Sequence, residues 1–61
     1  MDRTELVWRR DYARAHAAIP AEWIWTDADD GWQGIDPEYA GDPRVRHYQA
    51  LQRVGYARGW M

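Results

Sequence analysis

The sequence predicts a single, mainly α-helical domain in which two main helices, at about residues 4–18 and 43–57, pack antiparallel. Apolar residues recur at helical spacing in both segments, and an Asp-Pro step of the kind that begins helices precedes the second one. The segment between them is acidic and rich in turn residues. We expect this connector, residues 20–42, to pack across the helix pair and to contain one or two short helical turns.

The first helix is predicted from an apolar face on which Trp8, Tyr12, Ala15 and Ile19 follow one another at intervals of three or four residues. Pro20 ends this pattern, because proline cannot donate a backbone hydrogen bond and disfavours helical dihedrals in the residue before it. Two residues near the beginning can cap the helix: Asp2 and Thr4.

The stretch "IPAEWIWTD" allows two interpretations. Pro20 and Glu22 suit the first turn of a short helix, whereas an extended segment would place Trp23 and Trp25 on one face. We favour the helical turn, because a lone strand would have no partner elsewhere in the chain. The following "DADDGWQG" has the composition of a turn.

Two Asp-Pro steps give the clearest local signal. A residue before proline is held extended, aspartate is a good N-cap, and proline suits the first helical position. Asp36 should therefore begin a single turn that ends near Gly41, and Asp42 should begin the last helix.

The last helix has a predicted apolar face, but its end is ambiguous. Gly55 could end the helix or could lie on its inner face and allow close packing, in which case Gly59 ends it and Trp60 packs back. The predicted face consists of Tyr48, Leu51 and Val54, with Val45 at its edge. The residues expected in the core of the domain are Trp8, Tyr12, Ile19, Tyr48, Leu51 and Val54.

Length and composition restrict the function. A 61-residue chain without cysteine has a small core and no disulfide or thiolate metal site, and its five tryptophans and four tyrosines are too many to bury completely. There is no apolar run long enough to span a membrane and no secretion signal, so we expect a cytoplasmic protein. Arginine without lysine suggests a GC-rich coding sequence of bacterial or phage type.

Enzyme activity is not expected. The chain has no serine or cysteine nucleophile and no glycine-rich phosphate loop, and it is too small to form a desolvated cleft for acid-base chemistry. The two histidines, His16 and His47, are too few for a zinc site. We therefore expect no catalytic residues, no cofactor and no bound metal.

Calcium binding is an alternative that the acidic connector raises. Asp27, Asp29 and Glu38 stand at positions 1, 3 and 12 of an EF-hand loop, but Gly31 and Trp32 then occupy positions that need a ligand and a glycine. Shifting the frame by one residue restores the glycine and loses the acids. A solvated acidic turn explains these residues better.

Nucleic-acid binding through the last helix is a further alternative. The helix carries four arginines that could contact phosphates, interleaved with tyrosines that could stack on bases. The net charge of −2 argues against this partner, and we rank it below a protein partner. The residues concerned are Arg44, Arg46, Arg53 and Arg58, with Tyr48 and Tyr56.

Charge and aromatic content together favour protein binding. Residues 20–42 contain seven acids and no base, while residues 43–61 contain four arginines and no acid. We expect a small accessory or inhibitor protein that binds a larger protein through an acidic, aromatic surface. An acidic mimic of nucleic acid is an alternative mode, and a second copy of the chain is an alternative partner. The predicted contact residues are Asp27, Asp29, Asp30, Trp32, Glu38 and Tyr39.

Overall fold

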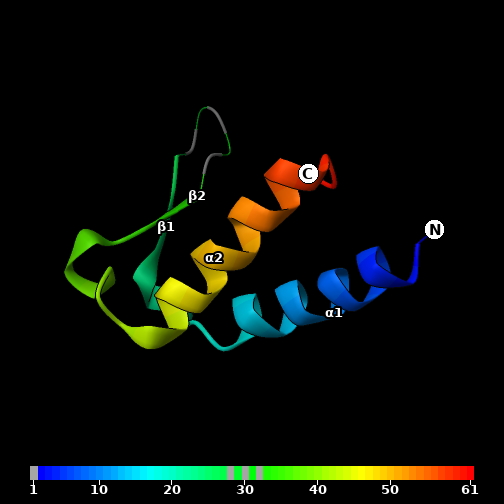
Figure 1. Ribbon diagram of the computed structural model, residues 1–61. Helices are drawn as coiled ribbons and strands as arrows, with labels where there is room; N and C mark the ends of the chain where they lie inside the picture. The colour runs from blue at the N-terminus through cyan, green and yellow to red at the C-terminus, as the bar shows by residue number, and fades with distance from the viewer. Residues whose placement is uncertain (1, 28, 30, 32) are drawn as a thin grey trace.

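The computed structural model describes residues 2–27, 29, 31 and 33–61 and confirms a mainly helical fold. Helix α1 spans Arg3–Ala17 and helix α2 spans Pro43–Arg58, and the two pack against each other. They run in opposite directions, so the two ends of the chain lie at the same end of the pair (Figure 1). Between them the chain forms four short elements: 3₁₀ helix η1 (Ala21–Trp23), strands β1 (Ile24–Thr26) and β2 (Gln33–Ile35), and 3₁₀ helix η2 (Pro37–Tyr39).

Local sequence signals set the ends of both helices. Asp2 caps α1 by accepting a hydrogen bond from the Thr4 backbone N–H at 3.0 Å. Asp42 caps α2, with Pro43 in the first turn as predicted. Helix α2 ends at Gly59, whose φ of 74° lies in the left-handed region that favours glycine. Of the two glycines considered, Gly59 therefore ends the helix.

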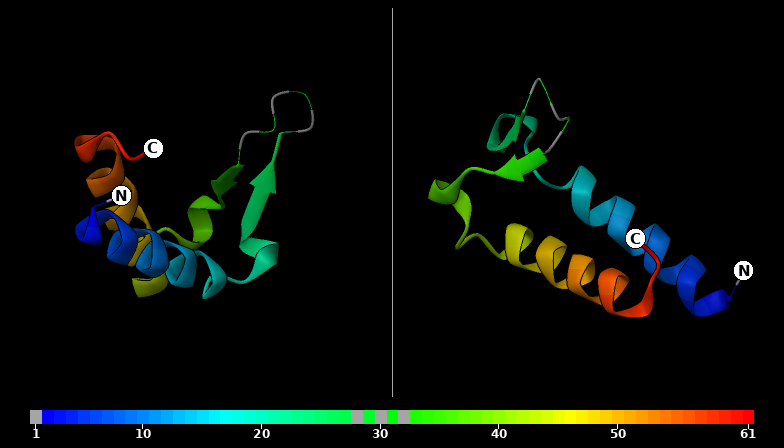
Figure 2. Two further views of the ribbon diagram at one scale, coloured as in Figure 1. Left: turned by 90° about the vertical axis from the view of Figure 1, so that its right-hand side faces the viewer. Right: turned by 90° about the horizontal axis from the view of Figure 1, so that it is seen from above.

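The hairpin corrects the expectation that an extended segment at residues 24–26 would lack a partner. β1 pairs antiparallel with β2, with Trp25 opposite Gly34 and Ile24 opposite Ile35. The predicted helical turn is present only at Ala21–Trp23. The intervening turn reverses the chain and brings Gln33–Ile35, which has no strand signal of its own, beside Ile24–Thr26. The strands project from the helix pair, with β2 on the side nearer to α2 (Figure 2).

The core lies where α1, α2 and the base of the hairpin meet. Ala15, Ile19 and Tyr48 are buried at its centre, and Trp8 is buried about two turns closer to the N-terminus of α1. Half-buried side chains pack around this centre: Tyr12, Trp23, Ile24, Ile35 and Leu51.

The prediction of Val54 as a core residue is wrong, because its side chain is 43% exposed. Val45, which the sequence placed at the edge of the apolar face, is instead fully buried. The two valines are nine residues apart, which is about two and a half helical turns. They therefore point to opposite sides of α2, and the contact with α1 and the hairpin buries only one of them.

An aromatic cluster joins the helices. Trp8 Nε1 donates a hydrogen bond to the Leu51 carbonyl oxygen at 2.8 Å, and the Trp8 ring packs 5.4 Å from Trp60, centroid to centroid. The Tyr12 ring stacks on Trp8 at 5.1 Å, and the Tyr12 and Tyr48 hydroxyl oxygens are 2.9 Å apart in a hydrogen bond. Burial, followed by this hydrogen bond, raises the pKa of the Tyr48 hydroxyl well above its ordinary value.

Candidate partner-binding surface

The half-buried ring of Trp23 holds the connector against α2. Tyr39 from η2 stacks on it with a centroid distance of 4.2 Å and an interplanar angle of 6°. The guanidinium of Arg44, in the first turn of α2, lies 4.6 Å from the centroid of the same ring. Stacking and cation–π attraction therefore fix η1, η2 and the beginning of α2 together.

Asp42 orients the arginine in this arrangement. Its carboxylate accepts hydrogen bonds from the Arg44 Nε at 3.1 Å and the second guanidinium nitrogen at 3.2 Å, as well as from the Arg44 backbone N–H at 2.8 Å. The side-chain bonds and then the backbone bond lower the pKa of Asp42. One aspartate thus caps the helix and positions the cation over Trp23.

Trp25 is an exposed tryptophan on strand β1. The alternation along a strand turns it away from the face on which Ile24 and Ile35 pack inward. Its indole lies across the cross-strand partner Gly34, where an added side chain would overlap the ring. Half of the residue nevertheless remains exposed, so the hairpin presents a large and locally fixed aromatic surface to solvent.

Trp23 and Trp25 do not share a face, as a continuous strand would require. Trp23 ends the 3₁₀ helix η1 and packs inward, whereas Trp25 lies within β1 and faces outward. Trp25 is not among the contact residues predicted from the sequence. The signal that could have found it is the glycine opposite it, because a tryptophan often covers a strand glycine.

Two of the predicted acids lie in the turn of the hairpin, which is built around Asp27. The Asp27 carboxylate accepts a hydrogen bond from the Asp29 backbone N–H at 2.9 Å, and the Asp27 carbonyl oxygen accepts one from Gly31 at 2.8 Å. The φ of Gly31 is 69°, which suits glycine. Asp27 therefore has a structural role, and the residues Asp27 and Asp29 are both exposed.

The other predicted contact residues have different positions. Glu38 lies exposed on η2, one turn from the hairpin base. Tyr39 is half-buried in its stack on Trp23. The predictions for Asp30 and Trp32 fall outside the described residues.

No group of three or more potential metal ligands is found among residues 2–27, 29, 31 and 33–61. Both histidines are exposed: His16 lies on α1 with its ring 5.5 Å from that of Tyr48, and His47 lies on α2. The carboxylate of Asp27 is already hydrogen-bonded within its own turn.

The four arginines of α2 have different surroundings. Arg44 is held by Asp42 and Trp23, and Arg58 lies over the Trp60 ring at 5.6 Å. Arg46 and Arg53 are exposed and form no ion pair with any described residue. Of the two tyrosines in the nucleic-acid alternative, Tyr48 is buried in the core and Tyr56 is exposed.

Together these features define a helix pair that carries a projecting hairpin with an acidic turn and an exposed tryptophan. No family model, curated protein or solved structure matches the chain. Within the described part of the chain, neither helix has the length and apolar character needed to cross a membrane.

Proposed function

We propose that this chain is a small non-enzymatic protein that binds a larger protein through the outer face of its hairpin. The observation that carries the proposal is the position of Trp25. Its ring is half-exposed on a strand and lies across Gly34, and the most acidic part of the sequence follows it directly. Tryptophan is strongly enriched among residues that dominate binding energy. The six predicted contact residues remain part of the proposal, with Trp25 added as the central anchor.

The charges support a basic partner. The acidic rim, which we define as Asp27, Asp29, Asp30 and Glu38, lies in the same stretch of sequence as Trp25, residues 20–42, which contains seven acids and no base. Such a rim accelerates association with a positively charged surface and sets its orientation. In one form of the proposal, the partner normally binds nucleic acid with its positively charged surface. The carboxylates of the acidic rim then take the place of the phosphates.

The test is to capture the partner from a lysate of the source organism with the tagged chain and then to measure its affinity for variants. Trp25→Ala should weaken binding by about 30-fold, the effect of losing an anchor worth about 2 kcal/mol. Leu6→Ala is the matched control, because Leu6 is 52% exposed on α1 and Trp25 is 50% exposed. Equal binding by Trp25→Ala and the wild type, with both folded, would remove the proposal.

The acidic rim is tested by charge reversal at Asp29. Asp29→Arg should slow association and make it less sensitive to salt, whereas Asp11→Arg on α1 should change neither. Duplex DNA added to the complex separates the two forms of the proposal. It should release the chain if the partner surface is a nucleic-acid groove and leave the complex intact if it is not.

A further inference from the structure

A second surface lies on the other side of β2, where a groove of about 210 Å³ separates the strand from α2. All three glutamines of the chain line this groove: Gln33, Gln49 and Gln52. The Gln52 amide nitrogen is 3.4 Å from the Tyr12 hydroxyl, but the carboxamides of Gln33 and Gln49 have no hydrogen-bond partner among the described residues. A carboxamide offers a donor and an acceptor side by side, which is the pattern that a peptide unit also presents.

The groove lies beneath the inner face of the hairpin. Gln33, Gly34 and Ile35 of β2 line it together with Ile24, which pairs with Ile35 from β1, and with His16 of α1. β2 is the strand nearer to α2, so its outer edge borders the groove on the α2 side (Figure 2). β1 occupies the opposite edge, and the described sheet has no third strand.

The hydrogen-bond pattern shows which backbone groups face this edge. The Asp36 N–H donates to the Trp23 carbonyl oxygen at 2.8 Å, which makes these two residues a hydrogen-bonded position of the antiparallel ladder. Because such positions alternate, Trp25 and Gly34 form the next one, and the N–H and C=O groups of Gln33 and Ile35 point away from β1. These groups are placed to pair with an added strand.

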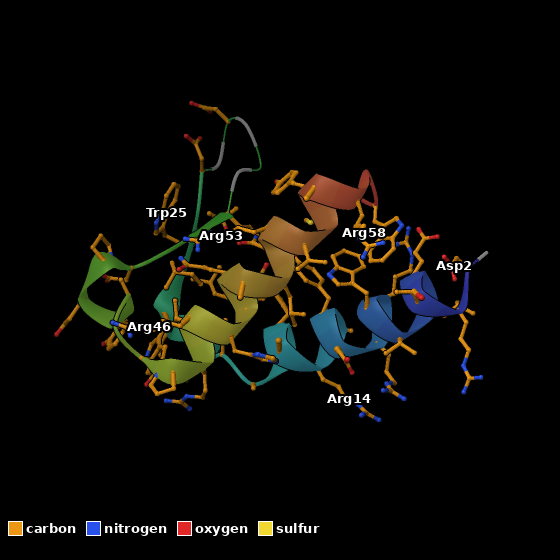
Figure 3. All side chains as sticks on the ribbon, in the orientation of Figure 1. Asp2, Arg14, Trp25, Arg46, Arg53 and Arg58 are labelled. Atoms are coloured by element: carbon orange, nitrogen blue, oxygen red, sulfur yellow. The ribbon has the colours of Figure 1, made fainter. Side chains whose placement is uncertain are left out.

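Positive charge lies beside the groove on α2. Arg46 and Arg53 are seven residues apart, which puts them on one side of the helix and about 10.5 Å apart along its axis. Gln49, which lines the groove, lies between them on the same side. Figure 3 shows both arginines extending to the same side of α2, and neither forms an ion pair with a described residue.

We infer that this groove binds an extended, acidic segment of a partner polypeptide, which adds a strand to the free edge of β2. The segment pairs its backbone with Gln33 and Ile35 and with the carboxamide of Gln49. Acidic side chains two or four residues apart on the segment, at about 7 or 13 Å, reach the guanidinium groups of Arg46 and Arg53. This surface goes beyond the proposed function, because Trp25 does not line the groove.

The lining of the groove favours a peptide backbone as its ligand. The lining contains three carboxamide side chains and no Asp, Glu or Arg, so it matches a peptide backbone, and the arginines lie outside it, where the side chains of a bound segment would point.

The experiment is a titration of the ¹⁵N-labelled full chain with a short, end-blocked peptide of alternating Glu and Val, followed by NMR. Saturable chemical-shift changes should centre on the backbone amides of Gln33 and Ile35 and on the side-chain amide of Gln49. Hydrogen exchange of the Gln33 and Ile35 backbone amides should slow in the complex. A peptide of alternating Glu and Pro, which lacks half of the backbone donors, should bind more weakly. The absence of saturable shifts at millimolar peptide, or shifts centred outside the groove, would overturn the inference.

Variants test the charge requirement. The double variant Arg46→Glu with Arg53→Glu should bind the Glu-Val peptide about three- to tenfold more weakly and a Lys-Val peptide more tightly. Arg14→Glu, on the far side of α1 in Figure 3, is the matched charge control and should leave both affinities unchanged. Equal affinity of the wild type for both peptides, or tighter binding of single-stranded DNA at the same amides, would contradict an acidic peptide as the occupant.

Discussion

The Trp8 indole lies against the α2 backbone at Gly55, in the space that a side chain at residue 55 would occupy. A Cβ added to Gly55 would overlap the Trp8 ring and lie 2.9 Å from the Met61 Cγ. The same indole donates its hydrogen bond to Leu51, one turn earlier on α2. A glycine inside a helix therefore determines how closely α1 and α2 pack.

Gly55→Ala should destabilise the protein, although alanine is the better helix former. Overpacking at such a contact costs about 1–3 kcal/mol, which exceeds the helix-propensity gain of about 1 kcal/mol. Urea unfolding followed by circular dichroism measures the difference. Gly41→Ala is the control, because a Cβ added at Gly41 meets no other atom and the φ of Gly41 is not positive. The free energy of unfolding of this variant should equal or exceed that of the wild type. A more stable Gly55→Ala would contradict the contact.

The Tyr12–Tyr48 hydrogen bond should contribute to stability. Tyr48→Phe leaves a part-buried hydroxyl at Tyr12 without this partner and should cost about 0.5–1.5 kcal/mol. A double-mutant cycle with Tyr12→Phe isolates the pair, and a coupling energy of zero would show that the hydroxyls do not interact.

Tyr48 should also make stability depend on alkaline pH. Its pKa is raised in the folded protein, so its contribution is fully present below the unfolded value of about 10 and is lost as pH rises above it, because the unfolded chain then releases a proton that the folded chain retains. The fall in unfolding free energy above pH 10 should become shallower in Tyr48→Phe. Tyr56→Phe, at a residue that is 65% exposed, should leave the slope as in the wild type.

Asp42 should make stability depend on acidic pH in the opposite sense. Its folded-state pKa is lowered by Arg44, so its contribution is present above the unfolded value of about 3.9 and disappears as pH falls through the folded value. Asp42→Asn keeps a good N-cap and removes the charge, and should flatten the acid limb of a melting-temperature profile. Asp2→Asn serves as the comparison, because Asp2 is also an N-cap but forms no ion pair with a described arginine. An unchanged acid limb in Asp42→Asn would argue against the pair.

Trp23 and Trp25 should differ in their effect on stability. Trp23→Ala removes the stack with Tyr39 and the contact with Arg44, and should cost about 2–3 kcal/mol, less than the 3–5 of a fully buried tryptophan. Trp25→Ala removes a half-exposed ring and should cost about 1 kcal/mol. Urea unfolding of both variants makes the comparison, and equal losses would contradict the inward and outward placement of the two rings.

Local chemistry made much of the helical framework predictable. The caps at Asp36 and Asp42 depend only on a side-chain acceptor and a following proline, and both were found as predicted. The pair of helices, the Glu5–Arg9 contact at 2.8 Å and the inward face of Trp8, Ala15 and Ile19 follow equally from spacing within a few turns.

Tertiary structure decided the rest, because those features depend on segments that are distant in sequence. The strand at Ile24–Thr26 exists because a turn brings Gln33–Ile35 beside it, and neither segment alone predicts that pairing. The choice between Val45 and Val54 depended on which side of α2 meets α1 and the hairpin. The sequence by itself determined where the helices begin and which residues can be apolar contacts. Only the packing of the elements determined that Trp25 faces solvent and that the glutamines gather beside β2, since exposure and clustering belong to the assembled surface.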